Sequence, residues 1–157
     1  MRIVVFADSH GNADVLRNIL HDQRDAEVVI HLGDGEREFD ELRPEHSDKI
    51  MRSVRGNSDW GSQSKMIDSI VLEQKRIIFA HGHTFNVKQS TSIILDVAID
   101  MNAHIALFGH THYSMTDYKQ GVYLMNPGSP TNPRRGRATY GIIDITEDGI
   151  ITQIVPV

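Results

Sequence analysis

Residues 2–34 read RIVVFADSHGNADVLRNILHDQRDAEVVIHLGD, and this stretch decides the class of fold. It begins and ends with short runs rich in β-branched residues, RIVVFAD (2–8) and AEVVIHLGD (26–34), which are typical of buried strands. Asn12 is placed to cap a helix after the first run. That helix is indicated by apolar residues on one of its faces, namely Val15, Leu16, Ile19 and Leu20. A strand, a helix and a strand in this order predict a βαβ unit.

The alternation of strands and helices continues along the chain. Two stretches predict helices: EREFDELRP (36–44), which ends at Pro44 because proline cannot continue a helix, and TSIILDVAIDMN (91–102). Three more runs resemble buried strands: DKIMRSVRGN (48–57), RIIFAHGH (76–83) and AHIALFGHTH (103–112). The last third of the chain predicts antiparallel strands with tight turns, and Asp148-Gly149 is a strong hairpin signal. We therefore expect an α/β fold, a four-layer α-β-β-α sandwich with two mixed sheets flanked by helices.

The composition is that of an ordinary globular protein. With 157 residues the chain is about as long as one domain of roughly 100 to 200 residues, and it has no repeat or long linker, so we expect a single domain over residues 1–157. No apolar run approaches the ~18 residues of a membrane span, and the first residues do not resemble a secretory signal. We therefore expect a cytoplasmic protein without a membrane partner. The net charge of -5 argues against extensive nucleic-acid binding, although not against a small phosphorylated substrate. Homo-oligomer formation is left open.

Side chains that bind metals follow the predicted strands. Since the chain has no cysteine, any metal must be held by oxygen and imidazole ligands. Ligands bind outside the carboxyl ends of strands in α/β sheets, so polar residues that follow several strands can meet there. His110 and His112 are expected to converge because side chains two residues apart on a strand point to the same side. The candidate residues are Asp8, His10, Asp34, Asn57, Asp59, His81, His83, His110 and His112.

Taken one at a time, these residues have simpler interpretations. Asp8 can cap the following helix, Asp34 can start a turn, and Asn57 and Asp59 are common turn residues. Most histidines are not metal ligands, so His110 and His112 taken alone are better explained as an exposed loop pair. His10 can be a surface imidazole, and His81 can be a nearly buried one at the end of an apolar strand. A metal site is favoured because the candidates follow five predicted strands in turn, and not by any one of them.

Five short motifs occur along the chain in a fixed order. They are Asp8-Ser9-His10, Gly33-Asp34, Gly56-Asn57-Ser58-Asp59, His81-Gly82-His83 and Gly109-His110-Thr111-His112. Further on, Asn126-Pro127-Gly128-Ser129 is followed by Pro133-Arg134. In these motifs the chain resembles the calcineurin-like, metal-dependent phosphoesterases, and among them the small bacterial and archaeal phosphodiesterases related to the retromer scaffold subunit. Any one motif is weak evidence, but chance does not account for all of them in order over essentially the whole chain.

The resemblance implies a site for two divalent metal ions. One ion would be held by Asp8, His10, Asp34 and His112, and the other by Asp34, Asn57, His81 and His110, with Asp34 as the bridge. Two cations about 3.5 to 4 Å apart can clamp the attacking and leaving oxygens of a phosphoryl transfer, and a metal lowers the pKa of its bound water toward about 7. The nucleophile would then be a metal-bound hydroxide. The ligand set suits transition metals better than Ca²⁺; we expect Mn²⁺ first, with Ni²⁺, Zn²⁺ and Fe as alternatives.

The residues expected to act on the substrate lie in the same motifs. We count Asp34, Asn57, Asp59 and His83 as catalytic candidates, and His83 is also a candidate to donate to the phosphate. Arg134 belongs to a basic stretch whose ordinary interpretation is a solvated loop, but arginine also suits bidentate recognition of phosphate. These assignments leave the identity of the substrate open.

Ser58 is the one departure from the pattern of the wider family. Many members have a histidine directly after the metal-binding asparagine, where it is thought to contact the substrate or protonate the leaving group. A serine hydroxyl cannot be cationic at neutral pH. We keep Ser58 as a candidate substrate contact, and we expect better turnover with activated or diester substrates than with poor leaving groups.

The combined sequence evidence predicts a dinuclear metal-dependent phosphoesterase, and a phosphodiesterase before a monoesterase. The alternative is a scaffold without catalytic activity, because relatives in the retromer complex use this fold to bind proteins. Every metal-ligand position of the family pattern is filled here by a competent residue, which favours the enzyme. An oxidoreductase or a nucleotide-binding module on a Rossmann-like sheet is disfavoured because the first strand–helix turn lacks the G-x-G-x-x-G motif.

Overall fold

The computed structural model describes all residues, 1–157. Its helices are α1 (Ala13–Asp22), α2 (Glu36–Leu42) and α3 (Ser92–Asp100), with short 3₁₀ turns η1 (Arg43–His46) and η2 (His83–Phe85). Its strands are β1 (Arg2–Phe6), β2 (Val28–His31), β3 (Ile50–Ser53), β4 (Ile67–Leu72), β5 (Lys75–Ala80), β6 (Ile105–Leu107), β7 (Ser114–Lys119), β8 (Val122–Pro127), β9 (Thr139–Thr146) and β10 (Gly149–Pro156). No helix is both long and apolar enough to cross a lipid bilayer.

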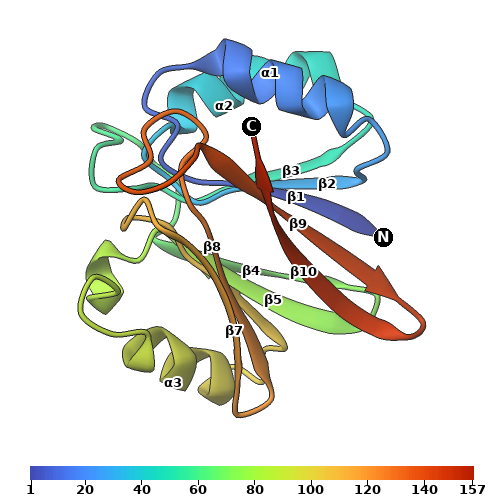
Figure 1. Cartoon of the computed structure of the whole chain (residues 1–157), viewed down its shortest axis with the longest axis vertical. Helices are drawn as coiled ribbons and strands as arrows, with labels where there is room; N and C mark the ends of the chain where they lie inside the picture. Colours follow the sequence, from blue (N-terminus) through green and yellow to red (C-terminus); the bar gives the residue numbers. More distant parts are fainter.

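The strands form two mixed sheets of five strands each. The first has the order β10-β9-β1-β2-β3, and the second has the order β4-β5-β6-β8-β7. In the first sheet β1, β2 and β3 run parallel, and β9 and β10 are antiparallel additions beside β1. In the second sheet β5, β6 and β8 run parallel, and β4 and β7 are antiparallel edge strands. Helices α1 and α2 cover the outer face of the first sheet, and α3 covers that of the second (Figure 1). The predicted four-layer α-β-β-α sandwich is confirmed.

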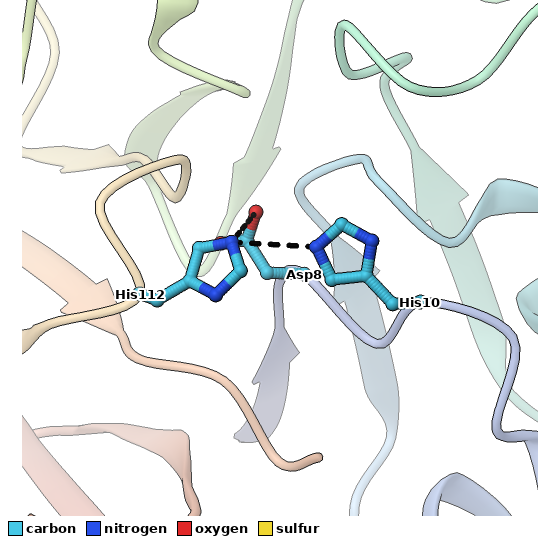
Figure 2. Close-up of side chains that lie close together, drawn as sticks. All are labelled: Asp8, His10 and His112. Carbon is cyan, nitrogen blue, oxygen red and sulfur yellow. Dashed lines mark hydrogen bonds and ion pairs between the residues drawn. The ribbon is translucent and has the colours of Figure 1, made fainter. Parts of the chain in front are cut away.

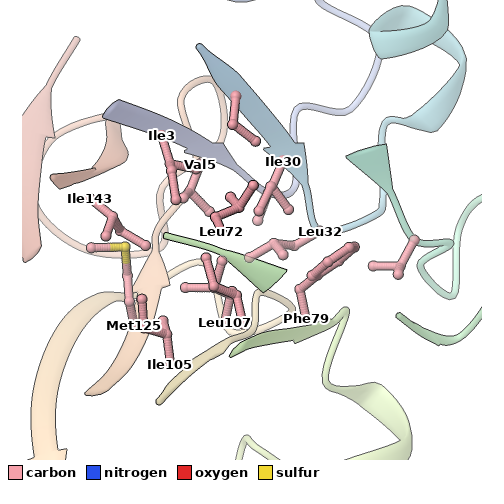
Figure 3. Close-up of a cluster of buried hydrophobic side chains, with 14 of the residues drawn as sticks. Ile3, Val5, Ile30, Leu32, Leu72, Phe79, Ile105, Leu107, Met125 and Ile143 are labelled. Atoms are coloured by element: carbon pink, nitrogen blue, oxygen red, sulfur yellow. The ribbon is translucent and has the colours of Figure 1, made fainter. Parts of the chain in front are cut away.

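The residues of β1 show why the strand forms in the middle of a sheet. Ile3 and Val5 point into the layer between the two sheets, whereas Val4 and Phe6 point toward α1 and α2. Successive side chains of a strand face opposite sides, so a strand covered on both faces must be apolar throughout. The layer between the sheets holds side chains from both of them, including Ile30, Phe79, Leu107 and Met125 (Figure 3).

Several local predictions are confirmed. Asn12 caps α1, since its Oδ1 accepts a hydrogen bond from the backbone N–H of Val15 at 3.3 Å. The βαβ unit has β1 and β2 parallel, with Ile3 opposite Val28. The hairpin at Asp148-Gly149 joins β9 to β10. These elements place the carboxyl ends of β1, β2 and β3 at one edge of the first sheet.

Two features of the second sheet differ from the sequence analysis. Strand β4 was not predicted, and it forms a hairpin with β5 through Glu73 and Gln74, which both have positive φ. Its polar pair Asp68 and Ser69 breaks the apolar run, which is why its composition does not resemble a buried strand. The expectation that the last third is wholly antiparallel is wrong for β8. This strand returns from β7 and inserts beside β6, so the two run parallel.

Candidate metal centre

All seven predicted metal ligands lie in loops that follow strand ends. These loops come after β1, β2 and β3 of the first sheet and after β5 and β6 of the second. The sandwich thus brings together residues that are up to 104 positions apart, such as Asp8 and His112. The seven residues are Asp8, His10, Asp34, Asn57, His81, His110 and His112. Contacts between the side-chain atoms of these seven residues join them into one cluster.

The first group of the cluster contains Asp8, His10 and His112, whose donor atoms lie close enough to hold one cation. The Nε2 atoms of His10 and His112 are 3.3 Å apart, and Nε2 of His112 is 3.4 Å from Oδ1 of Asp8. Figure 2 shows these side chains turned toward one another from two loops that are distant in the sequence. Two imidazole nitrogens and a carboxylate oxygen are a common ligand set for a transition metal.

The second group contains Asp8, Asp34 and His81. Nε2 of His81 lies 3.9 Å from Oδ1 of Asp8 and 3.5 Å from Oδ2 of Asp34. The same nitrogen is 3.2 Å from Oδ1 of Asn57 and 3.2 Å from Nδ1 of His110. Asp8 is therefore common to both groups, whereas the family pattern assigns the bridging role to Asp34. That role of Asp34 stays a prediction.

Backbone hydrogen bonds determine which nitrogen of two histidines faces the cluster. Nδ1 of His81 is 2.8 Å from the carbonyl oxygen of Leu32, and Nδ1 of His112 is 2.7 Å from that of Asn132. A carbonyl only accepts, so each Nδ1 carries the proton and donates it. In the neutral ring Nε2 then keeps its lone pair and points into the cluster. This arrangement is the usual one for a metal-binding histidine, in which the outer nitrogen is held by a hydrogen bond.

The electrostatics of the cluster favour a bound cation. Oδ1 of Asp8 is buried and accepts no hydrogen bond, although Oδ2 accepts the N–H of His110 at 2.9 Å. Burial raises the pKa of Asp8 to about 7. Burial also acts to lower the pKa of His81, but the carboxylates of Asp34 and Asp8 outweigh it and raise that pKa. A buried carboxylate oxygen without a partner is costly, and a metal ion supplies the missing partner. The residues present therefore fit a metal.

Two other histidines of the cluster, His110 and His112, are held in the form that binds metals. Burial lowers the pKa of His110 to about 4, and the neighbouring His81 acts in the same direction. Burial also lowers the pKa of His112, with a smaller effect in the same direction from His10. Metal binding requires the neutral imidazole, so these shifts remove the competing proton at neutral pH.

The backbone around the cluster is unusual. Five of the seven predicted ligands have positive φ, between 45° and 68°: Asp8, His10, Asp34, His110 and His112. Non-glycine residues adopt this region infrequently, and the other five of this chain lie in turns outside the cluster. Five at one place is typical of a functional site. This corrects the strand-based expectation for the histidine pair. Strand β6 ends at Leu107, so His110 and His112 converge on the cluster through a left-handed loop and not as alternate residues of a strand.

Asp34 lies in a closely fitted cradle. Ser58 donates its backbone N–H to Oδ1 of Asp34 at 2.7 Å and its hydroxyl to Oδ2 at 3.0 Å. A Cβ at Gly56 would overlap Oδ1 of Asp34. Burial acts to raise the pKa of Asp34, but hydrogen bonds from His81 and Ser58 outweigh it and hold the pKa below its ordinary range. The serine that replaces the family histidine thus fixes the orientation of the Asp34 carboxylate.

Asp59 holds the loop that carries Asp34. Its carboxylate accepts backbone N–H groups of Asp34, Gly35, Glu36 and Gly56 at 2.7 to 3.1 Å. Burial acts to raise the pKa of Asp59, but these hydrogen bonds outweigh it and lower the pKa. The carboxylate faces the backbone, so we interpret Asp59 as a positioning residue and not as one that touches the substrate.

The Asn126-Pro127-Gly128-Ser129 motif supports two ligand loops. The Asn126 amide donates to the carbonyl oxygen of Gly109 at 2.9 Å and to Oγ1 of Thr111 at 3.0 Å. The Ser129 hydroxyl donates to the carbonyl oxygen of Asp8 at 2.8 Å. Both side chains are buried. The motif therefore stabilises the loops of Asp8 and of the His110–His112 pair from behind.

Sequence reasoning missed a buried network beneath the cluster. The backbone N–H of Gly33 donates to Nδ1 of His31 at 3.1 Å, so Nε2 of the neutral ring donates to Oγ of Ser9 at 2.9 Å. Ser9 in turn donates to Oε1 of Glu38 at 2.8 Å. Ser9 lies between the candidate ligands Asp8 and His10. No local motif signals this network, because it joins three separate segments.

Acid is expected to destabilise the protein in part through His31. Burial lowers the pKa of His31 to about 4, so between about pH 6.5 and pH 4 the unfolded chain binds a proton that the folded chain does not. The free energy of unfolding should therefore fall across this range as the pH falls, by on the order of 3 kcal/mol from this group. Urea unfolding at pH 7.5 and pH 4.5 measures the difference. In His31→Gln the loss should be smaller, while other titrating groups contribute equally to both proteins. An equal loss in both proteins would exclude His31 as a source.

The predicted substrate contacts lie beside the cluster. The His83 ring centroid is 5.3 Å from that of His81 and 6.1 Å from that of His110, and Nδ1 of His83 is buried without a hydrogen bond. Arg134 is exposed, and its backbone N–H donates to the carbonyl oxygen of His112 at 3.4 Å. Both residues can approach a group bound at the cluster, and their contacts with a substrate stay predictions.

A cavity of about 650 Å³ opens next to the cluster. Its floor includes His10, Asp34 and Ser58, and its walls are the first turns of α2 and the loop 59–62. Most of the lining is polar or acidic, including Glu36 and Glu38. This volume lies within the ordinary range for small-molecule sites, which is about 300 to 1,000 Å³.

Comparison with known proteins agrees with this geometry. The chain is 28% identical over 152 residues to the probable metallophosphoesterase YsnB of Bacillus subtilis, covering 94% of this chain and 86% of that protein. It is 25% identical over 187 residues to the phosphodiesterase YfcE of Escherichia coli K12, covering 98% and 97%. Solved structures show the same fold. A predicted phosphoesterase from Streptococcus pneumoniae superposes with a TM-score of 0.84 at 26% identity, covering 99% of this chain and 88% of that one.

The solved structure of a Vps29 protein has the same fold. Vps29 of Chaetomium thermophilum superposes with a TM-score of 0.77 over 99% of this chain and 97% of that one, at 17% identity. At this identity the likeness concerns the fold alone. The family model for the calcineurin-like phosphoesterase superfamily domain matches residues 1–148. With that match over nearly its whole length, the chain belongs to the calcineurin-like phosphoesterase superfamily.

Proposed function

We propose that this protein is a dinuclear metal-dependent phosphoesterase, and a phosphodiesterase before a monoesterase. The observation that carries the proposal is that Asp8, whose buried Oδ1 accepts no hydrogen bond, belongs to both groups of donor atoms that could hold a metal ion. When bound, two divalent transition-metal ions supply Lewis acidity toward the phosphoryl oxygens and a nucleophile from water at neutral pH. We propose Mn²⁺ as the first choice, with Ni²⁺, Zn²⁺ or Fe as alternatives.

We assign the other roles at the site to residues of the chain: binding the metals, contacting the phosphate and positioning the loops. Asp8 and Asp34 supply the negative charge that offsets two cations, and Asn57 completes the oxygen ligands. The uncharged nitrogens of His110 and His112 complete the set without adding charge. We propose that His83 and Arg134 contact the phosphate from either side of the cluster. Asp59 acts at a distance, because it fixes the backbone of the Asp34 loop.

The relatives support this class of reaction. YsnB is described as a probable metallophosphoesterase and YfcE as a phosphodiesterase. The two matches cover 94% and 98% of this chain. We propose by extension that the substrate is a small phosphate ester and that the protein acts in the cytoplasm.

A non-catalytic scaffold is the alternative, and the fold shared with Vps29 allows it. A scaffold needs the sandwich, but it does not need a complete ligand set. In this chain five ligands adopt strained positive φ values, and two histidines have their outer nitrogens fixed by carbonyl groups. Such strain costs about 1 to 3 kcal/mol for each residue, and it persists where a function requires it. The strained backbone at the predicted ligands therefore favours the enzyme over the scaffold.

Metal removal and restoration test the proposal. Protein treated with a chelator should hydrolyse bis(p-nitrophenyl) phosphate at the background rate, and added Mn²⁺ should restore activity more than Mg²⁺ does. Hydrolysis of p-nitrophenyl phosphate by the same samples should be slower. Release of p-nitrophenol gives the rates, and elemental analysis gives the metal content. Activity that does not depend on metal contradicts the two-metal proposal. Full metal loading without hydrolysis of either ester favours the scaffold.

A further inference from the structure

Trp60 stands at the rim of the cavity beside the metal centre. The residue is 92% exposed, and it is the only hydrophobic residue in the lining. We propose that Trp60 is a stacking platform for a planar aromatic group, and that the preferred substrates are small phosphate esters that carry a nucleobase or a similar ring. This inference rests on the proposed phosphoesterase function, because it specifies the class of substrate for the same site.

The stability of the fold does not explain the position of this ring. Burial of a tryptophan is among the largest apolar contributions that a single side chain can make, and Trp60 makes almost none of it. Single exposed apolar residues are common on protein surfaces, so exposure alone is weak evidence. The evidence becomes specific because the ring lines the same cavity as His10, Asp34 and Ser58.

The loop that carries Trp60 is fixed to the metal centre. Asp59, directly before it, accepts four backbone N–H groups of the Asp34 loop and the preceding turn. The backbone N–H of Trp60 donates to the carbonyl oxygen of Ser58 at 3.0 Å, and Ser62 donates to that of Asp59 at 3.2 Å. The anchored backbone keeps the ring beside the cavity, so binding costs the ordering of one side chain and not of a whole loop.

The other residues that line the cavity limit the charge of a ligand that can bind beside Trp60. Glu36, Glu38 and Asp40 lie on the α2 side, and Arg37 is the only arginine or lysine of the lining. Carboxylates repel further phosphate groups, so the cavity is better suited to an uncharged ring than to a chain of nucleotides. A single phosphate at the metal centre with one aromatic group against Trp60 satisfies both constraints.

Trp60 offers a direct measurement of this contact, because it is the only tryptophan in the chain. Its fluorescence can be titrated with adenosine monophosphate and with ribose 5-phosphate in the presence of Zn²⁺, whose filled d shell makes it a suitable cation for this purpose. The nucleotide should quench the emission to saturation, with an apparent Kd at least about tenfold below that of the sugar phosphate, since base stacking is typically worth that much. Equal quenching by both ligands would overturn the inference.

Kinetics provide the second measurement. Trp60→Ala should raise KM for bis(p-nitrophenyl) phosphate by about tenfold with kcat changed less than twofold, and Trp60→Phe should keep most of the affinity. Tyr118→Ala is the matched control. Tyr118 is also an exposed aromatic residue, but its partner Tyr123 aligns with the first residue of β6, at the end of the sheet opposite the metal centre. An unchanged KM in Trp60→Ala, in a chain that hydrolyses the diester, overturns the inference and leaves the proposed function intact. A wild-type chain that hydrolyses no phosphate ester with any metal overturns both.

Discussion

Replacing Asp34 with asparagine is expected to lower kcat/KM for an aryl phosphodiester by roughly a thousandfold or more. Asp34 contributes one of the two buried carboxylates of the cluster, and hydrogen bonds from His81 and Ser58 hold its pKa below the ordinary range. The Asp34 side chain is therefore negatively charged at the neutral pH of the assay. Asparagine keeps one acceptor oxygen for Ser58 but removes the charge, and several kcal/mol of charge stabilisation depend on it. The variant should also bind fewer metal ions, which elemental analysis of the dialysed protein measures.

A control must separate loss of metal from loss of fold. Asp25→Asn makes the same chemical change at an exposed turn between α1 and β2, and it should leave both activity and metal content unchanged. Circular dichroism and thermal unfolding of Asp34→Asn should stay close to those of the wild type, because the volume of the side chain is conserved. Full activity in a folded Asp34→Asn protein would exclude the two-metal mechanism.

Much of the fold is predictable because its strands are covered on both faces. In β1, β2 and β6 nearly every residue is apolar, and such runs are recognisable without any partner. Strand β4 is different: its burial is only intermediate over most of its length, so its composition resembles that of a loop. The direction of β8 was missed for another reason. It depends on which strand β8 pairs with on the side away from β7, and the local sequence does not predict that pairing.

The residue types of the metal centre are predictable, but the way in which they are held is not. Five local motifs predict the seven ligands, and the structure brings their side chains together. The left-handed conformations of Asp8, Asp34 and His110 are imposed by the surrounding loops. The same is true of the network of Ser9, His31 and Glu38, whose members come from three segments. Such contacts exist only after folding, so no sequence period or spacing reveals them.

Ser58 orients Asp34, and we expect it also to determine how strongly the rate depends on the leaving group of the substrate. Its hydroxyl donates to Oδ2 of Asp34 at 3.0 Å, so its proton is committed to a ligand and not to a leaving group. A general acid typically contributes a factor of about 100 to 10,000, and Ser58 cannot supply it. For diesters with leaving groups from p-nitrophenol to methanol, log kcat should therefore fall steeply as the pKa of the leaving alcohol rises.

Two substitutions at this exposed position make the expectation specific. Ser58→His has room for the larger side chain, and it should make the dependence on the leaving group shallower by raising kcat for alkyl esters, where protonation of the leaving oxygen matters most. Ser58→Ala removes the hydrogen bond to Asp34 but adds no acid, so it should lower kcat for all esters and keep the steep dependence. The slope of log kcat against leaving-group pKa, measured for the three proteins, separates the two roles of the residue. If wild-type protein hydrolyses an alkyl phosphomonoester as fast as an aryl diester, the leaving oxygen receives its proton from another group, and His83 is then the residue to replace.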